Sequence, residues 1–276
     1  MITSSTQLKA KIRNLSGNDS KKAQTLIRIF IMERFLERVC LSKYRNNFIL
    51  KGGMLVASIV GLDTRATMDI DTTVSSIHLT KENAARIIEE IISIELPDKV
   101  HFQINRITDI MELHNYPGIR LTLDATMDNL RQSIKVDIST GDVITPNAVE
   151  YNYKLIFEDR SIHMWTYNLE TLLAEKLETI MARGLANTRM RDFYDIHIIG
   201  SKKEYKPEVL KSAFLSTCKA RSTLNQIPGF SDILIALKKD STLIKQWNLF
   251  RANSFFVKES WEEVMESVQH VASVVI

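Results

Sequence analysis

Polar and apolar residues alternate around residue 70, and this alternation predicts a β-strand over residues 67–73. Successive side chains of a strand point to opposite faces of its sheet. One face of this strand carries Thr67, Asp69 and Asp71, whereas the other face is suited to burial. Two carboxylates therefore share one face of a strand that is otherwise built for a protein core.

A second alternating segment, over residues 133–139, repeats this design with Lys135 and Asp137 on its polar face. If the two strands are neighbours, Asp137 joins Asp69 and Asp71. Three like charges at short range are unfavourable unless a cation lies among them, and an all-oxygen ligand set favours Mg²⁺ or Mn²⁺. The alternative interpretation is an exposed polar face on an edge strand.

The remaining periodicity divides the chain into an α/β part and a helical part. Helices are expected over 20–42, 54–60 and 81–96, and further strands over 100–107, 118–125 and 133–140. From Leu169 onward every strong segment has a helical pattern. We expect an α/β domain with N-terminal helices over residues 1–166 and a helical domain over residues 167–276.

Gly52 and Gly53 lie at the entrance of the helix expected over 54–60. Without side chains, their backbone N–H groups can approach a phosphate closely, and a helix N-terminus favours an anion. A glycine pair alone is weak evidence for phosphate binding. It gains weight because two aspartates on a strand, and a third on a later strand, follow it.

The helical part places charge on faces that are otherwise apolar. Lys176 lies in the middle of the apolar face of the helix that follows Asn168, and Asp195 lies on the inward side of the next helix. A buried lysine must be paired or must face a cleft, because an unpaired buried ammonium is costly. Two interpretations remain open, and they are compatible: a structural ion pair between the two helices, or contact of Lys176 with a triphosphate.

Charge is unevenly distributed although the net charge is only +3. Residues 1–50 and 201–258 each carry an excess of seven positive charges, residues 51–200 an excess of seven negative charges, and the tail from 259 carries four glutamates. An acidic centre between basic flanks suits a carboxylate site that acts on a polyanion, because carboxylates alone would repel such a substrate. The alternative is that the basic residues are ordinary solvated helical faces.

Composition places the chain among globular proteins of a reducing compartment. Hydrophobic residues make up 45% and charged residues 25% of the 276 positions. The two cysteines, Cys40 and Cys218, are too far apart to suggest a metal site or a disulfide framework. With no secretory-signal pattern and no apolar run long enough to cross a bilayer, we expect a cytoplasmic protein without a membrane partner.

The ordered set of motifs resembles the AbiEii/AbiGii toxin family of nucleotidyltransferases over roughly residues 48–200. The motifs are KGG (51–53), RATMDID (65–71), KVDI (135–138), AEKL (174–177) and RDFYDI (191–196). The resemblance implies a polymerase-beta-like nucleotidyltransferase fold joined to a helical domain. It also implies a toxin of a type IV toxin–antitoxin system in abortive infection and phage defence, with a cognate antitoxin as partner.

This family is thought to use Mg²⁺ and a nucleoside triphosphate (NTP), with GTP binding reported for some members and transfer to tRNA for others. The resemblance implies catalytic roles for Asp69, Asp71, Asp137, Lys176 and Asp195, of which the first three would bind the metal. The nucleotide-binding residues would be Gly52, Gly53, Arg65, Thr67, Lys135 and Lys176. Met54 departs from the pattern, because a thioether cannot donate the hydrogen bond that a hydroxyl gives to phosphate at this position.

We therefore expect a Mg²⁺- or Mn²⁺-dependent nucleotidyltransferase toxin that transfers a nucleotide to a hydroxyl, on the 3′ end of an RNA such as tRNA. One alternative is a non-catalytic NTP- or RNA-binding module on the same fold. Another is nucleotidylation of a protein side chain.

Overall fold

The computed structural model describes residues 1–111 and 117–276, which form two compact units. Unit 1 comprises Met1–Ile59, Ala66–Asp142 and Val149–Thr166, and unit 2 comprises Val60–Arg65, Val143–Ala148 and Tyr167–Ile276. The division of the chain is therefore not a single cut, because unit 2 takes two short segments from within the N-terminal sequence.

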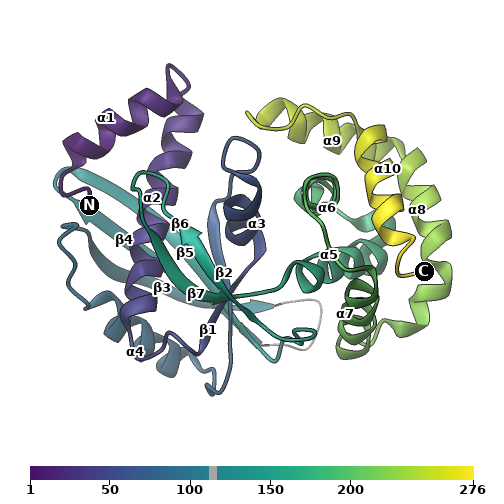
Figure 1. Ribbon diagram of the computed structural model, residues 1–276, viewed down its shortest axis with the longest axis horizontal. Helices are drawn as coiled ribbons and strands as arrows, with labels where there is room; N and C mark the ends of the chain where they lie inside the picture. Colours follow the sequence, from purple (N-terminus) through teal and green to yellow (C-terminus); the bar gives the residue numbers. More distant parts are fainter. Residues whose placement is uncertain (112–116) are drawn as a thin grey trace. The chain divides into compact units, whose positions relative to one another are not determined.

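Unit 1 is built on a sheet whose described residues form seven strands in the order β3-β4-β5-β2-β1-β7-β6 (Figure 1). The strands are β1 (Phe48–Lys51), β2 (Asp69–Val74), β3 (His101–Met111), β4 (Pro117–Met127), β5 (Leu130–Thr140), β6 (Val149–Lys154) and β7 (Ser161–Thr166). The β2–β5 and β1–β7 pairs are parallel and the other pairs are antiparallel. The expected neighbourhood of the two aspartate-bearing strands is confirmed.

Two of the helices in this region pack against the sheet. The helices of this region are α1 (Ser5–Ser16), α2 (Ser20–Leu41), α3 (Gly52–Val60) and α4 (Lys81–Ile92). The long helix α2 crosses the sheet and contacts β5 and β7, while α4 lies against β3 (Figure 1). Alternate residues of β5, such as Val136 and Ile138, are buried, and the residues between them, Lys135 and Asp137, are more exposed. The polar side chains of the central strands therefore share one face of the sheet.

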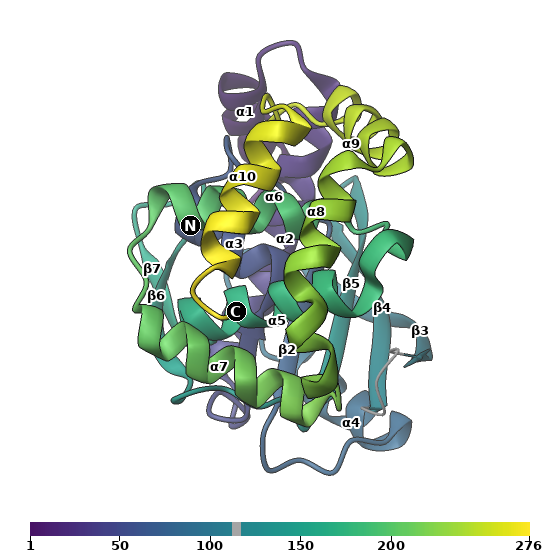
Figure 2. The ribbon, with the colours of Figure 1, turned by 90° about the vertical axis from the view of Figure 1, so that its right-hand side faces the viewer.

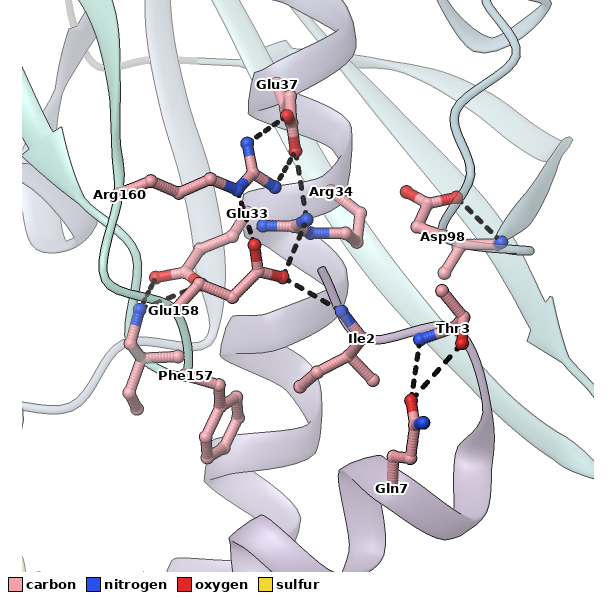
Figure 3. Close-up of polar contacts among 12 residues, drawn as sticks. Ile2, Thr3, Gln7, Glu33, Arg34, Glu37, Asp98, Phe157, Glu158 and Arg160 are labelled. Carbon is pink, nitrogen blue, oxygen red and sulfur yellow. Dashed lines mark hydrogen bonds and ion pairs between the residues drawn. The ribbon is translucent and has the colours of Figure 1, made fainter.

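Helix α2 is largely buried although several of its side chains are charged. Arg34 lies 2.9 Å from Glu37 and 3.4 Å from Glu158, and Arg160 pairs with the same two glutamates (Figure 3). The backbone N–H of Ile2 also donates to Glu158. These charges are paired with one another, which is the condition under which burial of ions is tolerated.

Unit 2 is helical in its C-terminal part, with α5 (Leu169–Arg183), α6 (Met190–Lys202), α7 (Pro207–Ala220), α8 (Phe230–Lys239), α9 (Ser241–Asn253) and α10 (Trp261–Ala272). Helix α10 contacts α6 and α8, and Figure 2 shows α8 and α10 next to one another. The core of unit 2 contains aromatic side chains, and the ring of Trp261 lies 5.1 Å from that of Phe193 and 5.8 Å from that of Trp247 between centroids. No helix in the described part of the chain combines the length and apolar character that a bilayer crossing needs.

Hydrogen bonds tie the two inserted segments to the helices of unit 2. The Tyr194 hydroxyl donates to the backbone carbonyl of Thr64 at 2.9 Å. The Asn168 side chain donates to the carbonyls of Thr145 and Asn147, both at 2.9 Å, and it also caps α5 through the Thr171 N–H. Tyr194 of α6 and the N-cap residue of α5, Asn168, thus hold the two inserted segments, 60–65 and 143–148.

The structure corrects several expected elements. The strand expected to begin at residue 67 begins at Asp69, and the Thr67 hydroxyl before it donates to the Asp69 carbonyl at 3.2 Å. The helix expected over 81–96 ends at Ile92, where the N–H of Ser93 closes the last turn. Strands β6 and β7 were not expected, and helix α1 was covered only by the general expectation of N-terminal helices.

Candidate active site

A row of four charged residues crosses the centre of the sheet in unit 1. Arg120 on β4 is the register partner of Asp137 on β5, Asp137 is the partner of Asp71 on β2, and Asp71 is the partner of Lys51 on β1. Residues directly opposite one another on adjacent strands project from the same face. Two carboxylates therefore lie between two cations.

The neighbouring row on the same face pairs Asp69 with Lys135. Asp69 is half-buried and Lys135 is exposed. Since β2 and β5 run parallel, Asp69 and Asp71 on one strand face Lys135 and Asp137 on the next. The polar faces expected from the sequence are thus brought together as predicted.

Asp71 is the most perturbed carboxylate of this face. Burial, followed by repulsion from Asp137, raises its pKa from 3.8 to about 6, and Lys51 only partly opposes this change. Its Oδ2 atom accepts a long hydrogen bond, 3.4 Å, from the Gly53 N–H. The ionised form is therefore disfavoured in the folded protein, which is the effect expected when like charges are held close together.

Only glycine fits at position 52, because the carboxylate of Asp71 lies where a side chain would begin. Its φ is +66°, and a Cβ atom added there would lie 2.1 Å from Asp71 Oδ2. A side chain at this position is excluded both by the backbone conformation and by the aspartate. The glycine pair has a role toward Asp71 that the sequence did not suggest, while its role toward phosphate stays a prediction.

Arg120 binds both carboxylate oxygens of Asp137. Its Nε atom lies 2.7 Å from Oδ1, and its Nη2 atom lies 2.6 Å from Oδ2. The hydrogen bonds to Asp137 hold the pKa of Arg120 above its ordinary value despite partial burial, and the charges of Asp137, Asp69 and Asp71 add to this effect. The guanidinium therefore acts as a counter-ion for the whole carboxylate face.

Lys51 is likewise paired, on the other side of the row. Its Nζ atom lies 2.6 Å from Asp142, whose carboxylate also accepts a hydrogen bond of 2.7 Å from Ser139. Burial alone would raise the pKa of Asp142, but Lys51 and these hydrogen bonds outweigh it, and the pKa lies below its ordinary value.

The three aspartates expected to bind metal share this face but do not form a closed ligand cluster. Over residues 1–111 and 117–276, no three His, Cys, Asp or Glu side chains are grouped closely enough to hold a metal ion. At this site Asp137 is paired with Arg120. The oxygen-only donor set still fits a hard divalent cation, and a cation would relieve the repulsion that raises the Asp71 pKa.

A second charge cluster lies within unit 2. Lys176 lies 2.8 Å from Asp192 and 2.7 Å from Asp195. Arg65, from the inserted segment, binds Asp195 through Nε at 2.5 Å and Nη2 at 3.2 Å. Arg189 binds Asp192 at 2.7 Å. The ion pair between Lys176 and Asp195, one of the two interpretations that the sequence left open, is therefore present. Arg65 binds the same aspartate.

Burial and pairing act against each other in this second cluster. Burial would raise the pKa of Asp192, but Lys176 and Arg189 outweigh it and lower the pKa to about 2. Burial would lower the pKa of Lys176, but Asp192 and Asp195 raise it. Asp192 and Lys176 are therefore both held in their charged forms.

Comparison with known proteins identifies the family. A model of the nucleotidyl transferase AbiEii toxin of type IV toxin–antitoxin systems matches residues 34–267, which is most of the chain. The chain belongs to the AbiEii family. Membership implies a nucleotidyltransferase toxin with an antitoxin partner.

Solved structures show the same fold as this AbiEii protein. JHP933 from Helicobacter pylori is 15% identical with a TM-score of 0.53, and 91% of each chain is covered. A candidate nucleotidyltransferase from H. pylori is also 15% identical, with a TM-score of 0.54 and coverage of 91% of this chain and 94% of that one. No curated protein matches the chain. The expected fold class, a nucleotidyltransferase-like α/β unit with a C-terminal helical part, is confirmed.

The family motifs of this AbiEii protein fall into the two charge clusters. The second and third motifs supply Asp69, Asp71, Lys135 and Asp137 to the sheet of unit 1, and the last two supply Lys176 and Asp195 to the helices of unit 2. The resemblance implies that Thr67 binds the nucleotide. In the structure Thr67 is buried, and its hydroxyl donates a hydrogen bond to the Asp69 carbonyl. The catalytic and binding roles of all these residues stay predictions.

Sequence reasoning missed three charged residues of the carboxylate face: Lys51, Arg120 and Asp142. For Arg120 a usable signal was present, because Ile119, Leu121 and Arg120 alternate and so place the arginine on the polar face of β4. For Asp142, which lies beyond the end of β5, no periodic signal was available.

Proposed function

We propose that this AbiEii protein transfers a nucleotide from an NTP to a hydroxyl group on the 3′ end of an RNA such as tRNA, with Mg²⁺ or Mn²⁺ as cofactor. The observation that carries this proposal is the aligned face of Asp69, Asp71 and Asp137, on which burial and repulsion raise the Asp71 pKa to about 6. Growth inhibition in phage defence would follow from the loss of usable tRNA.

The chain's own oxygen atoms would hold the cofactor. Asp69, Asp71 and Asp137 would supply carboxylate ligands to a divalent cation, which, when bound, neutralises the charge of the triphosphate and of the site. Lys135, exposed beside Asp69, would contact the triphosphate together with the backbone of Gly52 and Gly53, while Lys176, in unit 2, keeps as a separate proposal the nucleotide-binding role that the family resemblance implies. Arg65 and Thr67 are buried, so their roles in binding would be indirect. Arg65 would hold Asp195, and the Thr67 hydroxyl would hold the backbone of Asp69.

The reaction exchanges one phosphorus–oxygen bond for another. The acceptor hydroxyl oxygen forms a bond to the α-phosphorus, the bond from that phosphorus to the bridging oxygen breaks, and pyrophosphate leaves. We assign the hydroxyl proton to Asp137. The basic residues of the 1–50 and 201–258 segments would attract the RNA, because a polyanion is drawn to positive potential.

The test is incorporation of label from each α-labelled NTP in turn, with Mg²⁺ and total cellular RNA, resolved on a denaturing gel. We expect label in a tRNA-sized band, and we expect Asp69→Ala to reduce it more than about a hundredfold, since even groups that only orient a metal ligand contribute ten- to hundredfold. Asp159→Ala, at an exposed aspartate of the same unit, is the matched control and should keep full activity. A folded Asp69→Ala protein with full activity would exclude this role.

A second candidate function is non-catalytic binding of an NTP or RNA, and Met54 favours it. Met54 follows the glycine pair, is 1% exposed and offers no hydroxyl to a phosphate. This alternative predicts bound NTP without any labelled product. Label in protein rather than RNA would instead indicate a protein acceptor.

A further inference from the structure

The pairing of Arg120 with Asp137 bears on how the carboxylate face takes up a cation. Both oxygens of Asp137 are engaged by the guanidinium, at 2.7 and 2.6 Å. A carboxylate in a bidentate pair with arginine presents its best lone pairs to the N–H groups. Asp137 can therefore offer these lone pairs to a cation only if Arg120 gives up at least one of the two oxygens.

Exposure distinguishes this pair from a structural one in the same unit. Arg38 and Asp98 form a pair of the same bidentate kind, at 2.9 and 3.0 Å, with side chains that are 2% and 0% exposed. The Arg120 side chain is 38% exposed, and that of Asp137 is 16% exposed. A half-exposed guanidinium can return to water at small cost, whereas separation of a buried pair leaves uncompensated charges.

The surroundings of Arg120 also favour exchange with a cation. Its charge interacts with Asp69 and Asp71 as well as with Asp137, so it compensates the same group of carboxylates that a divalent cation would compensate. The two cations are alternatives, because a positive charge beside a metal site opposes metal binding by Coulomb repulsion.

We propose that Arg120 is a positioning residue that holds Asp137 in the cation-free protein and yields it to the divalent cation, so that metal binding and the Arg120–Asp137 pair exclude one another. The inference rests on the proposed function, because it takes the carboxylate face as the cation site. It assigns to Arg120, which lies outside the family motifs, control over metal affinity.

The test is Mn²⁺ affinity of the full chain without nucleotide, measured from the loss of the free-ion signal in electron paramagnetic resonance. Arg120→Gln should bind Mn²⁺ about five- to tenfold more tightly than the wild type, because one like charge is removed and Asp137 is released. Arg120→Lys, which keeps the charge but cannot bind both oxygens, should fall between the two. Arg131→Gln, at an exposed arginine near the start of β5, is the matched control and should leave the affinity unchanged.

A double-mutant cycle shows whether the effect passes through Asp137. Asp137→Asn should weaken Mn²⁺ binding. In the Asp137→Asn protein, Arg120→Gln should increase the Mn²⁺ affinity much less than it does in the wild-type protein. Equal gains in both backgrounds, or an Arg120→Gln protein that binds Mn²⁺ no more tightly than the wild type, would overturn the proposal. Asp69→Asn separates this failure from that of the proposed function.

If Asp69→Asn weakens binding while Arg120→Gln changes nothing, the cation site stands and the role of Arg120 is wrong. If no Mn²⁺ binds to any of these proteins, the proposed metal-dependent function fails, and the role of Arg120 fails with it. Circular dichroism of each variant confirms that the comparison is made between folded proteins.

Discussion

The two charge clusters of this AbiEii protein contain the same kinds of residue in opposite balance. The carboxylate face on the sheet of unit 1 has more carboxylates (Asp69, Asp71, Asp137 and Asp142) than cations (Lys51, Arg120 and Lys135). Within unit 2, three cations surround the two carboxylates of Asp192 and Asp195. The first cluster carries excess negative charge, and the second is neutralised by its own residues.

The pKa values record this difference. Asp71 has its pKa raised to about 6, whereas Asp192 has its pKa lowered to about 2, although burial acts in the same direction on both. Nearby charge therefore decides the outcome. The ionised sheet cluster therefore lowers the free energy of unfolding and is suited to a cation. The helix cluster needs no added cation, because its own residues compensate its carboxylates.

The largest effect on stability is expected from Lys176→Met. The substitution leaves Asp192 and Asp195 with reduced compensation in a buried site, and removal of one partner from a buried network costs about 3–5 kcal/mol. Urea denaturation at pH 7 measures the change. Lys211→Met, at an exposed lysine of α7, is the matched control and should change stability by less than about 0.5 kcal/mol. A Lys176→Met protein as stable as this control would show that the helix cluster does not hold unit 2 together.

A smaller effect of opposite sign is expected from Asp71→Asn. Because the folded-state pKa of Asp71 is raised above the unfolded value of 3.8, its ionisation destabilises the fold as pH rises from about 4 to about 6. The variant should be more stable than the wild type by about 3 kcal/mol at pH 7, since a change of one in the pKa is worth about 1.4 kcal/mol, and it should be equally stable near pH 4. Urea denaturation in EDTA at both pH values measures this difference, with Asp159→Asn as control. A difference that does not depend on pH would contradict the assignment.

Asp192 should show the reverse dependence on pH. Its folded-state pKa is depressed, so it contributes stability above the unfolded value of 3.8, and that contribution is lost as the pH falls toward about 2. Between pH 4 and 7 it remains constant. The titration of Asp71 can therefore be observed in this range without interference from Asp192.

Most of the sheet cluster could be predicted from the sequence because strand alternation has a period of two. The polar faces of β2 and β5 were visible, and their parallel pairing brings Asp71 opposite Asp137. The pairing of Arg120 with Asp137 was also accessible in principle. The Asp128–Asn129 turn between Met127 and Leu130 sets the hairpin register that makes them partners.

The helix cluster could be predicted only in part. Lys176 and Asp195 were recognised from charge on apolar helical faces, with their ion pair as one of two interpretations. Arg65 was assigned to nucleotide binding, and its partner Asp195 lies far along the sequence. Local patterns do not report such long-range contacts, and for the same reason the transfer of segments 60–65 and 143–148 to unit 2 was not expected.

Anomalous scattering of Mn²⁺, in crystals of the protein grown with Mn²⁺ and a non-hydrolysable NTP analogue, would locate the cation site. We expect an anomalous peak within coordination distance of Asp69 and Asp71, with Asp137 released from Arg120. A bound nucleotide with no peak at these carboxylates, or with the cation at other residues, would contradict the claim that this face is the metal site of the transferase.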